Sequence, residues 1–213
     1  MTASSSDSLR ADARRNRRQL IDAAARAFAE DGGDVPMEEI ARRAGVGVGT
    51  LYRRFPDRDA LVLAVAQESL QDLVAQVRQA VQQEPRAWDA LVRSISYSRD
   101  LKLAVRPASS VSPTAAEAVR NDPVIADLRH EFAGLLTGLV EGAQREGSMR
   151  GDVGAGDVVH LFTLVYRATE TRPEGTADLA AQRALGVVLD GLRIGPHGPL
   201  PGHPLRPEDL RRP

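Results

Sequence analysis

The sequence predicts an all-α protein with about nine helices, and two observations support this prediction. Apolar residues recur at a spacing close to 3.6 along most of the chain, which is typical of helices with one buried face. The one alternating stretch, VGVGT at residues 46–50, is too short for a strand and lies between two helical patterns. With 213 residues, the chain is long enough for a small domain joined to a larger one.

The first helical pattern covers residues 11–31, where apolar positions and many alanines favour a helix. Gly32 and Gly33 then end this helix, because glycine readily adopts the backbone conformation that closes one. The preceding residues 1–9 are polar and rich in serine, so we expect a disordered arm there.

Two short helices follow the first one. The earlier of the two begins near Pro36, because proline suits the first helical turn, and it ends at Gly45. The later one runs from about Val48 to Phe55, where Pro56 disfavours a further helical residue. The segment is therefore predicted to be two short helices joined by a glycine-containing turn.

Longer helices are predicted for the rest of the chain up to residue 193. Asp57 is expected to cap a fourth helix that continues to about Gln82. Further helical patterns cover residues 88–103, 114–121, 123–145, 157–169 and 176–193. The tail, residues 195–213, holds six of the thirteen prolines, so we expect a flexible segment that packs on nothing.

The stretch AGVGVGTLYRRF at residues 44–55 has two interpretations. A phosphate-binding glycine loop follows a strand, whereas a helix precedes these glycines, and their spacing is G-x-G-x-G rather than G-x-G-x-x-G. The alternative is a helix-turn-helix, in which Gly45 permits the steep turn while Leu51 and Phe55 face inward. This second interpretation places the following residues on the outer face: Gly47, Val48, Thr50, Tyr52, Arg53 and Arg54.

Positive charge is concentrated around this turn, although the formal net charge of the chain is −1. Residues 10–18 and residues 42–58 each hold five arginines and one acidic residue. Either cluster alone is explained by a solvated helix face, and we keep that explanation for Arg42 and Arg43. The two clusters together indicate an anion-binding surface, and a short, exposed, basic helix suits the DNA major groove.

Residues 14–63 resemble the DNA-binding domain of TetR-family transcriptional regulators. The matching segments are RRQLIDAAARAFAEDG and MEEIARRAGVGVGTLYRRFPDRDAL. Later in the chain, DLKLAVRPASSV and NDPVIADLRHEFAGLL look like one common branch of TetR-type ligand domains. Two positions depart from the usual pattern: Arg54 stands where many relatives have histidine, and Val35-Pro36 stands where many have serine or threonine.

The resemblance implies a double-stranded DNA operator as partner, bound by a homodimer, and it suggests a role for each outward residue. Phosphate contacts are expected from Thr50, Tyr52, Arg54 and Arg58. Base contacts are expected from Gly47, Val48 and Arg53, since an arginine can donate two hydrogen bonds to guanine. Arg17 is expected to reach the DNA backbone or the minor groove.

The resemblance also divides the chain into a DNA-binding domain at residues 10–56 and an effector-binding and dimerisation domain at residues 57–194. The strongly apolar last two helices are the expected dimer interface, through Val158, Phe162, Val165, Leu185, Val188, Leu189 and Leu192. The expected lining of an effector pocket is Trp88, Tyr97, Leu101, Phe132, Leu136, Phe162 and Tyr166.

These expectations lead to a homodimeric repressor that a small-molecule effector releases from its operator. One alternative is a regulator of the same fold without a small-molecule ligand, and another is an all-helical enzyme. No catalytic residues, metal ligands or cofactor are predicted, because the sequence shows no serine–histidine–acid spacing, no metal-ligand cluster and no phosphate loop. The absence of a signal segment or a long apolar run favours a cytoplasmic, nucleoid-associated protein without a membrane partner.

Overall fold

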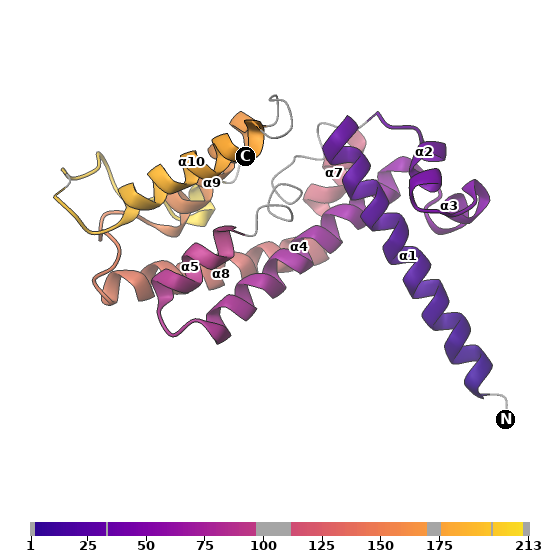
Figure 1. Ribbon diagram of the computed structural model, residues 1–213, viewed down its shortest axis with the longest axis horizontal. Helices are drawn as coiled ribbons and strands as arrows, with labels where there is room; N and C mark the ends of the chain where they lie inside the picture. The colour runs from indigo at the N-terminus through magenta and orange to yellow at the C-terminus, as the bar shows by residue number, and fades with distance from the viewer. Residues whose placement is uncertain (1–2, 33, 97–111, 170–175, 197, 211–213) are drawn as a thin grey trace. The chain divides into compact units, whose positions relative to one another are not determined.

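A computed structural model describes residues 3–32, 34–96, 112–169, 176–196 and 198–210. The described residues form nine α-helices and one short 3-10 helix, and they contain no β-strand. Within these described ranges, one antiparallel bridge pairs Met149 with Arg193. The predicted all-α class is therefore confirmed (Figure 1).

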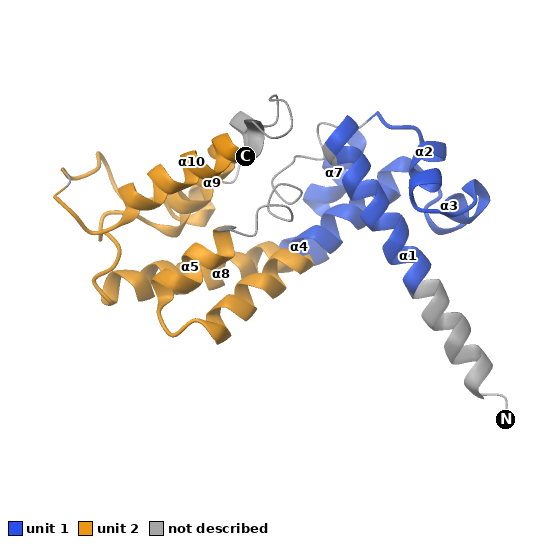
Figure 2. Cartoon of the chain, in the orientation of Figure 1, with its two compact units in different colours: residues 1–70, 106–126 blue, residues 71–105, 127–213 orange. Residues whose placement is uncertain are grey.

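The chain forms two compact units, which Figure 2 shows in different colours. Unit 1 comprises residues 1–70 and 106–126, and unit 2 comprises residues 71–105 and 127–213. The helices of unit 1 are α1 (Ala3–Asp31), α2 (Met37–Arg43), α3 (Val48–Arg54), the first part of α4 (Arg58–Gln83) and α7 (Pro113–Asn121). Its core contains the fully buried side chains of Leu20, Ile40 and Leu51.

Two features of unit 1 differ from the prediction. Helix α1 begins at Ala3, so residues 3–9 are helical where we expected a disordered arm. The physical reason is that residues 3–31 contain neither glycine nor proline, and nothing stops the helix from extending. The boundary expected after residue 56 is also displaced, because the first part of α4 and all of α7 belong to the same unit as the helix-turn-helix.

Helix α7 joins this unit through side chains at both of its ends. At the N-terminal end, the Ser112 hydroxyl donates to a carboxylate oxygen of Asp59 over 2.9 Å. At the C-terminal end, the Gln67 amide donates to a carboxylate oxygen of Asp122 over 3.1 Å. Both Asp59 and Gln67 lie on α4, so the first part of α4 and α7 are held together along their length.

Unit 2 contains the rest of α4 and most of α8, together with α5, α9, α10 and the short 3-10 helix η2. These elements are α5 (Ala87–Ser96), α8 (Pro123–Arg145), α9 (Ala155–Thr169), α10 (Thr176–Leu192) and η2 (Pro207–Leu210). Helix α9 packs against both α10 and η2. After α10, the Arg193 guanidinium lies 4.7 Å from the centre of the buried Trp88 ring, in a cation–π arrangement.

The predicted helices agree with these bounds to within a few residues, apart from the start of α1. As expected, Asp57 caps α4, since its carboxylate accepts from the Ala60 amide over 2.7 Å. Asp122 caps α8 in the same way, through the Ile125 amide at 2.9 Å. Of the helix predicted for residues 88–103, the part up to residue 96 forms α5, and the rest lies outside the described residues.

The expectation of an unpacked tail is wrong for residues 198–210, part of the yellow end of the chain in Figure 1. The Leu205 amide donates to a carboxylate oxygen of Asp157 over 2.9 Å, and the Leu205 carbonyl accepts from the Gly156 amide over 2.9 Å. On the side of the tail, backbone polar groups make these contacts. A proline-rich composition, which argues against helices and strands, therefore does not exclude packing.

Candidate nucleic-acid interface

The turn between α2 and α3 depends on Gly45. Its φ angle is +69°, a left-handed conformation that glycine adopts at little cost. The Gly45 amide donates to the Arg42 carbonyl over 3.1 Å, and the Val46 amide donates to the Ala41 carbonyl over 3.0 Å. These bonds close the end of α2, and the chain then leaves at a steep angle to begin α3.

Helix α3 is anchored by one face only. Leu51 is completely buried and Phe55, which follows the helix, is 4% exposed. The predicted outward residues lie on the rest of α3 and its N-terminal end: Gly47, Val48, Tyr52, Arg53 and Arg54 are exposed, and Thr50 is partly exposed. The structure thus gathers six of the eight predicted DNA-binding residues on one exposed, basic and aromatic surface, which we call the α3 face.

The other two predicted DNA-binding residues have partners inside unit 1. The Arg17 guanidinium lies 5.7 Å from the centre of the Phe55 ring and 4.0 Å from a carboxylate oxygen of Glu68. The Arg58 guanidinium donates to the Val35 carbonyl. Both side chains therefore link elements of unit 1, and their contacts with phosphate stay a prediction.

Arg43 was expected on a solvated helix face, and the structure corrects this. Its guanidinium lies 2.6 Å from a carboxylate oxygen of Asp31 and 3.2 Å from one of Glu30, at the end of α1. It also donates to Glu39, one turn earlier on α2, over 2.8 Å. Arg43 therefore ties α2 to the end of α1, and so supports the helix that leads into the turn.

Glu39 is the shared acceptor of this cluster. Its two carboxylate oxygens accept from the Arg42 side chain over 2.7 Å each, while one of them also accepts from Arg43. The hydrogen bonds from Arg42 and then from Arg43 lower the pKa of the Glu39 carboxyl to about 2. Sequence reasoning missed this cluster, although a glutamate three and four residues before two arginines was a signal for it.

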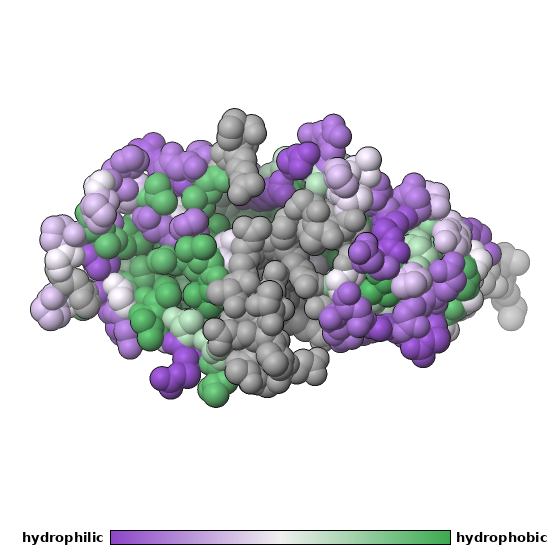
Figure 3. Space-filling view, turned by 90° about the horizontal axis from the view of Figure 1, so that it is seen from above, coloured by the Kyte–Doolittle hydropathy of each residue, from purple (hydrophilic) through white to green (hydrophobic). Residues whose placement is uncertain are grey.

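The predicted dimer residues are divided between the core and the surface of the single chain. Val158, Phe162, Leu185 and Leu192 are buried in it, so they pack inside one chain and do not face solvent. Val165, Val188 and Leu189 are partly exposed. Among the described side chains of α9 and α10, three large apolar ones that were not predicted at the interface are exposed: Leu164, Leu179 and Val187 are 50%, 57% and 73% exposed. Figure 3 shows hydrophobic surface gathered over this part of unit 2.

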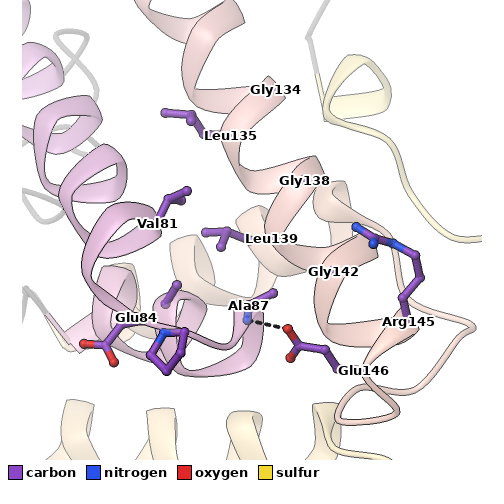
Figure 4. A pocket seen from close by; sticks show the side chains of 12 residues that line it. Val81, Glu84, Ala87, Gly134, Leu135, Gly138, Leu139, Gly142, Arg145 and Glu146 are labelled. Atoms are coloured by element: carbon purple, nitrogen blue, oxygen red, sulfur yellow. Dashed lines mark hydrogen bonds between the residues drawn. The ribbon is translucent and has the colours of Figure 1, made fainter.

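One cavity among the described residues is lined by other side chains than those expected for an effector pocket. That cavity, of about 500 Å³, lies between the end of α4, α5 and α8 (Figure 4). Its lining includes Val81, Leu135, Leu139, Gly134 and Gly138, and none of the predicted residues. Trp88, Leu136 and Phe162 are buried core residues, and Phe132 is partly exposed. Tyr97, Leu101 and the Tyr166 side chain lie outside what the structure describes.

Metal-binding clusters and membrane-spanning helices are both absent from the described part of the chain. It holds no group of three or more histidine, aspartate or glutamate side chains arranged to bind a metal ion. None of its helices combines the length and the apolar character needed to cross a lipid bilayer.

Comparison with known protein families gives two matches that together cover most of the chain. Residues 20–65 match the model described as "Bacterial regulatory proteins, tetR family". Residues 96–194 match the model described as "Transcriptional regulator SbtR-like, C-terminal domain". The first match contains α2, the turn and the α3 face, and the second ends two residues after α10.

Individual relatives agree with these matches. The HTH-type transcriptional repressor KstR2 of Rhodococcus jostii is 29% identical over 192 residues, which cover 85% of this chain and 92% of that protein. A TetR transcriptional regulator of Streptomyces coelicolor is 32% identical, with a TM-score of 0.66 over 83% of this chain and 98% of that one. A TetR regulatory protein of Mycobacterium vanbaalenii is 31% identical, with a TM-score of 0.61 over 87% and 99%. These relatives are regulators and not enzymes, and the chain belongs to the TetR family of DNA-binding transcriptional regulators.

Proposed function

We propose that the protein is a homodimeric repressor that binds a two-fold operator through the α3 face and is released from it by a small-molecule effector. The observation that carries the DNA-binding part is the exposure of Arg53, Arg54 and Tyr52 on a helix whose opposite side is fixed by the buried Leu51. A short helix held in this way presents a constant set of side chains to the major groove.

The roles proposed for the α3 face differ by position. Gly47 lies at the N-terminal cap of α3, where the absence of a side chain lets the backbone approach the bases closely. Val48 is 36% exposed and can pack on a thymine methyl group. Arg53 is proposed to read guanine, while Arg54 is proposed to contact phosphate.

Dimerisation is proposed through α9 and α10. Leu164, Leu179 and Val187 leave a large apolar surface on this helix pair, and such a surface favours association with a second copy. A dimer presents two recognition helices, which in this class of protein lie about 34–36 Å apart to match one turn of DNA. Repression is supported by the name of the relative KstR2, a transcriptional repressor.

Effector release follows from linkage. Suppose that an effector binds more tightly to a dimer conformation in which the spacing of the α3 faces does not fit the operator. It must then weaken operator binding, by a factor no larger than the ratio of its affinities for the two conformations. Helix α4 is the proposed transmitter, because residues up to Leu70 belong to unit 1 and residues from Gln71 belong to unit 2. A chromosomal operator places the protein in the cytoplasm, at the nucleoid.

The DNA-binding roles can be tested by anisotropy of labelled duplex DNA from the protein's own upstream region, against a scrambled duplex. Arg53→Ala should cost about 1–3 kcal/mol on the operator and relax one base position. Arg54→Ala should weaken binding to both duplexes alike, and it should reduce the slope of log affinity against log salt concentration by about one. Arg145→Ala, which removes the same charge from α8 in unit 2, is the matched control.

Two results would contradict these roles. Equal loss on both duplexes for Arg53→Ala would mean that Arg53 contacts phosphate only. An unchanged salt slope for Arg54→Ala would remove that residue from the interface.

Thermal-shift screening of small molecules tests the effector, because a ligand of the native state must raise the melting temperature. A regulator without a small-molecule ligand would show no such shift.

A further inference from the structure

The C-terminal segment at residues 198–210, which we call the strap, has no role in the function described so far. It lies beyond residue 194, where the match to the C-terminal domain family ends. It nevertheless packs on α9 through its 3-10 helix η2. The strap is therefore a packed segment that lies outside the matched family domain, and what its contacts do for the protein is a separate question.

The first part of the strap is held by the loop between α8 and α9. The Arg150 guanidinium donates to the Gly198 carbonyl over 2.8 Å. Asp152 accepts from the Leu200 amide over 2.8 Å, and it also receives two hydrogen bonds from Arg150, at 2.6 and 2.9 Å. One arginine–aspartate pair thus holds two backbone groups of the strap.

The second part of the strap caps α9. The first amides of a helix have no partner within it, so they need acceptors from elsewhere. The Leu205 carbonyl accepts from the Gly156 amide over 2.9 Å, in the first turn of α9. The Asp157 carboxylate accepts from the Gly154 amide over 2.8 Å and from the Leu205 amide over 2.9 Å, so the strap and the helix start are bonded in both directions.

The close approach of the strap requires glycine beneath it. A Cβ atom added to Gly156 would lie 2.5 Å from the Arg206 carbonyl oxygen, and one added to Gly154 would lie 2.2 Å from the Leu205 carbonyl oxygen. Both neighbours are backbone atoms, which cannot rotate away as a side chain can. Gly156 lies inside the first turn of α9, where glycine is less favourable than alanine, and the close approach of the strap explains why glycine stands there.

We propose that the strap is a tertiary N-terminal cap that fixes the start of α9 on α10 and thereby strengthens the dimer. The dimer part rests on the proposed function, in which α9 and α10 carry the interface. Helix α9 connects the strap to the proposed dimer surface directly. It contacts η2 as well as α10, and its own Leu164 is 50% exposed. Loss of the strap leaves the Gly156 amide without its acceptor and removes the Leu205 amide from the Asp157 carboxylate, so the first turn of α9 frays and the apolar surface loses its fixed shape.

The test compares Gly156→Ala with Gly138→Ala in the full chain. Both add one methyl group to a helix, but a Cβ at Gly138 meets nothing within 4 Å. Without a seated strap, both changes should raise the melting temperature, since alanine favours a helix more than glycine does. With the strap seated, only Gly156→Ala should lower the melting temperature and speed amide exchange at residues 154–158 by about tenfold or more.

The same two variants are examined by sedimentation equilibrium over a range of concentrations. Gly156→Ala should raise the dimer dissociation constant by about tenfold, while Gly138→Ala should leave it unchanged. A chain ending at Ile194 gives a second variant, which should show the same rapid exchange without any added methyl group.

Slow exchange at residues 154–158 in both strap variants would overturn the cap. Rapid exchange with an unchanged dissociation constant would overturn its link to the dimer. A wild-type chain that stays monomeric at every concentration would contradict the proposed dimer, and with it this link. The exchange measurement on that monomer would still decide whether the strap caps α9, so the two failures are distinguishable.

Discussion

Glycine is required at two joints of this molecule for different physical reasons. At Gly45, before the recognition helix, the φ angle is +69° and a Cβ atom would have open space around it. At Gly156, under the strap, φ lies outside the left-handed range, but a Cβ atom would meet a carbonyl oxygen at 2.5 Å. Gly45 is needed for its left-handed backbone conformation, whereas Gly156 is needed because no space is left for a Cβ atom. An alanine substitution should therefore destabilise the protein at each position for a different reason, and the two reasons can be told apart by experiment.

The largest effect is expected at Gly154, where an added Cβ would meet the Leu205 carbonyl oxygen at 2.2 Å. Gly154→Ala should lower the free energy of unfolding by about 1–3 kcal/mol, the usual cost of overpacking. Chemical denaturation of the full chain measures it. In a chain ending at Ile194 the same substitution should cost much less, because the clashing segment is gone. An equal loss of unfolding free energy in both chains would show that a clash with the strap is not the reason why Gly154 must be glycine.

A smaller effect is expected at Gly45. Gly45→Ala should cost about 1–2 kcal/mol, because a Cβ atom disfavours the left-handed conformation. Gly45→Asn should cost less, since asparagine tolerates this conformation better than other residues with a side chain. Denaturation curves of the two variants give the comparison. Neither cost should change in the chain ending at Ile194, and a cost that fell on truncation would mean that the two joints are coupled.

The smallest effect concerns the charges beside the first joint. The pKa of Glu39 is lowered from 4.5 to about 2, so its contribution to stability is complete above pH 4.5 and is lost as pH falls toward 2. Glu39→Gln should remove this part of the acid sensitivity, seen as a flatter dependence of melting temperature on pH in that window. Glu38→Gln, at the exposed neighbouring position, is the control. Identical pH profiles for the wild type and Glu39→Gln would exclude the arginine cluster as a source of stability.

Much of unit 1 could be predicted because its signals are local. Gly45, Pro56 and the spacing of Leu51 and Phe55 are enough to place the turn and to orient α3. The start of α1 was missed for a related reason. The serine-rich composition of residues 1–9 indicated disorder, but no residue between Ala3 and Asp31 stops a helix.

The missed features depend on contacts between distant residues. Arg43 is only half-exposed because the end of α1, twelve and thirteen residues earlier, is folded against α2. The strap bonds to residues about fifty positions earlier through its own backbone groups, so these contacts leave no apolar pattern in the sequence of the strap. The pair Gly154 and Gly156, just before the helix predicted for residues 157–169, was the available signal, because glycine permits another segment to pass close by.

Arg193 and Trp88 give the protein an optical probe of its own. Trp88 is the one tryptophan of the chain, and the guanidinium that follows α10 lies 4.7 Å from its ring. Light absorbed at the red edge of the protein spectrum is therefore emitted from a single place, where α5 meets the end of α10. A displacement there changes the wavelength or intensity of that emission, so the unlabelled wild-type protein reports any movement of the end of α10 against α5 in real time.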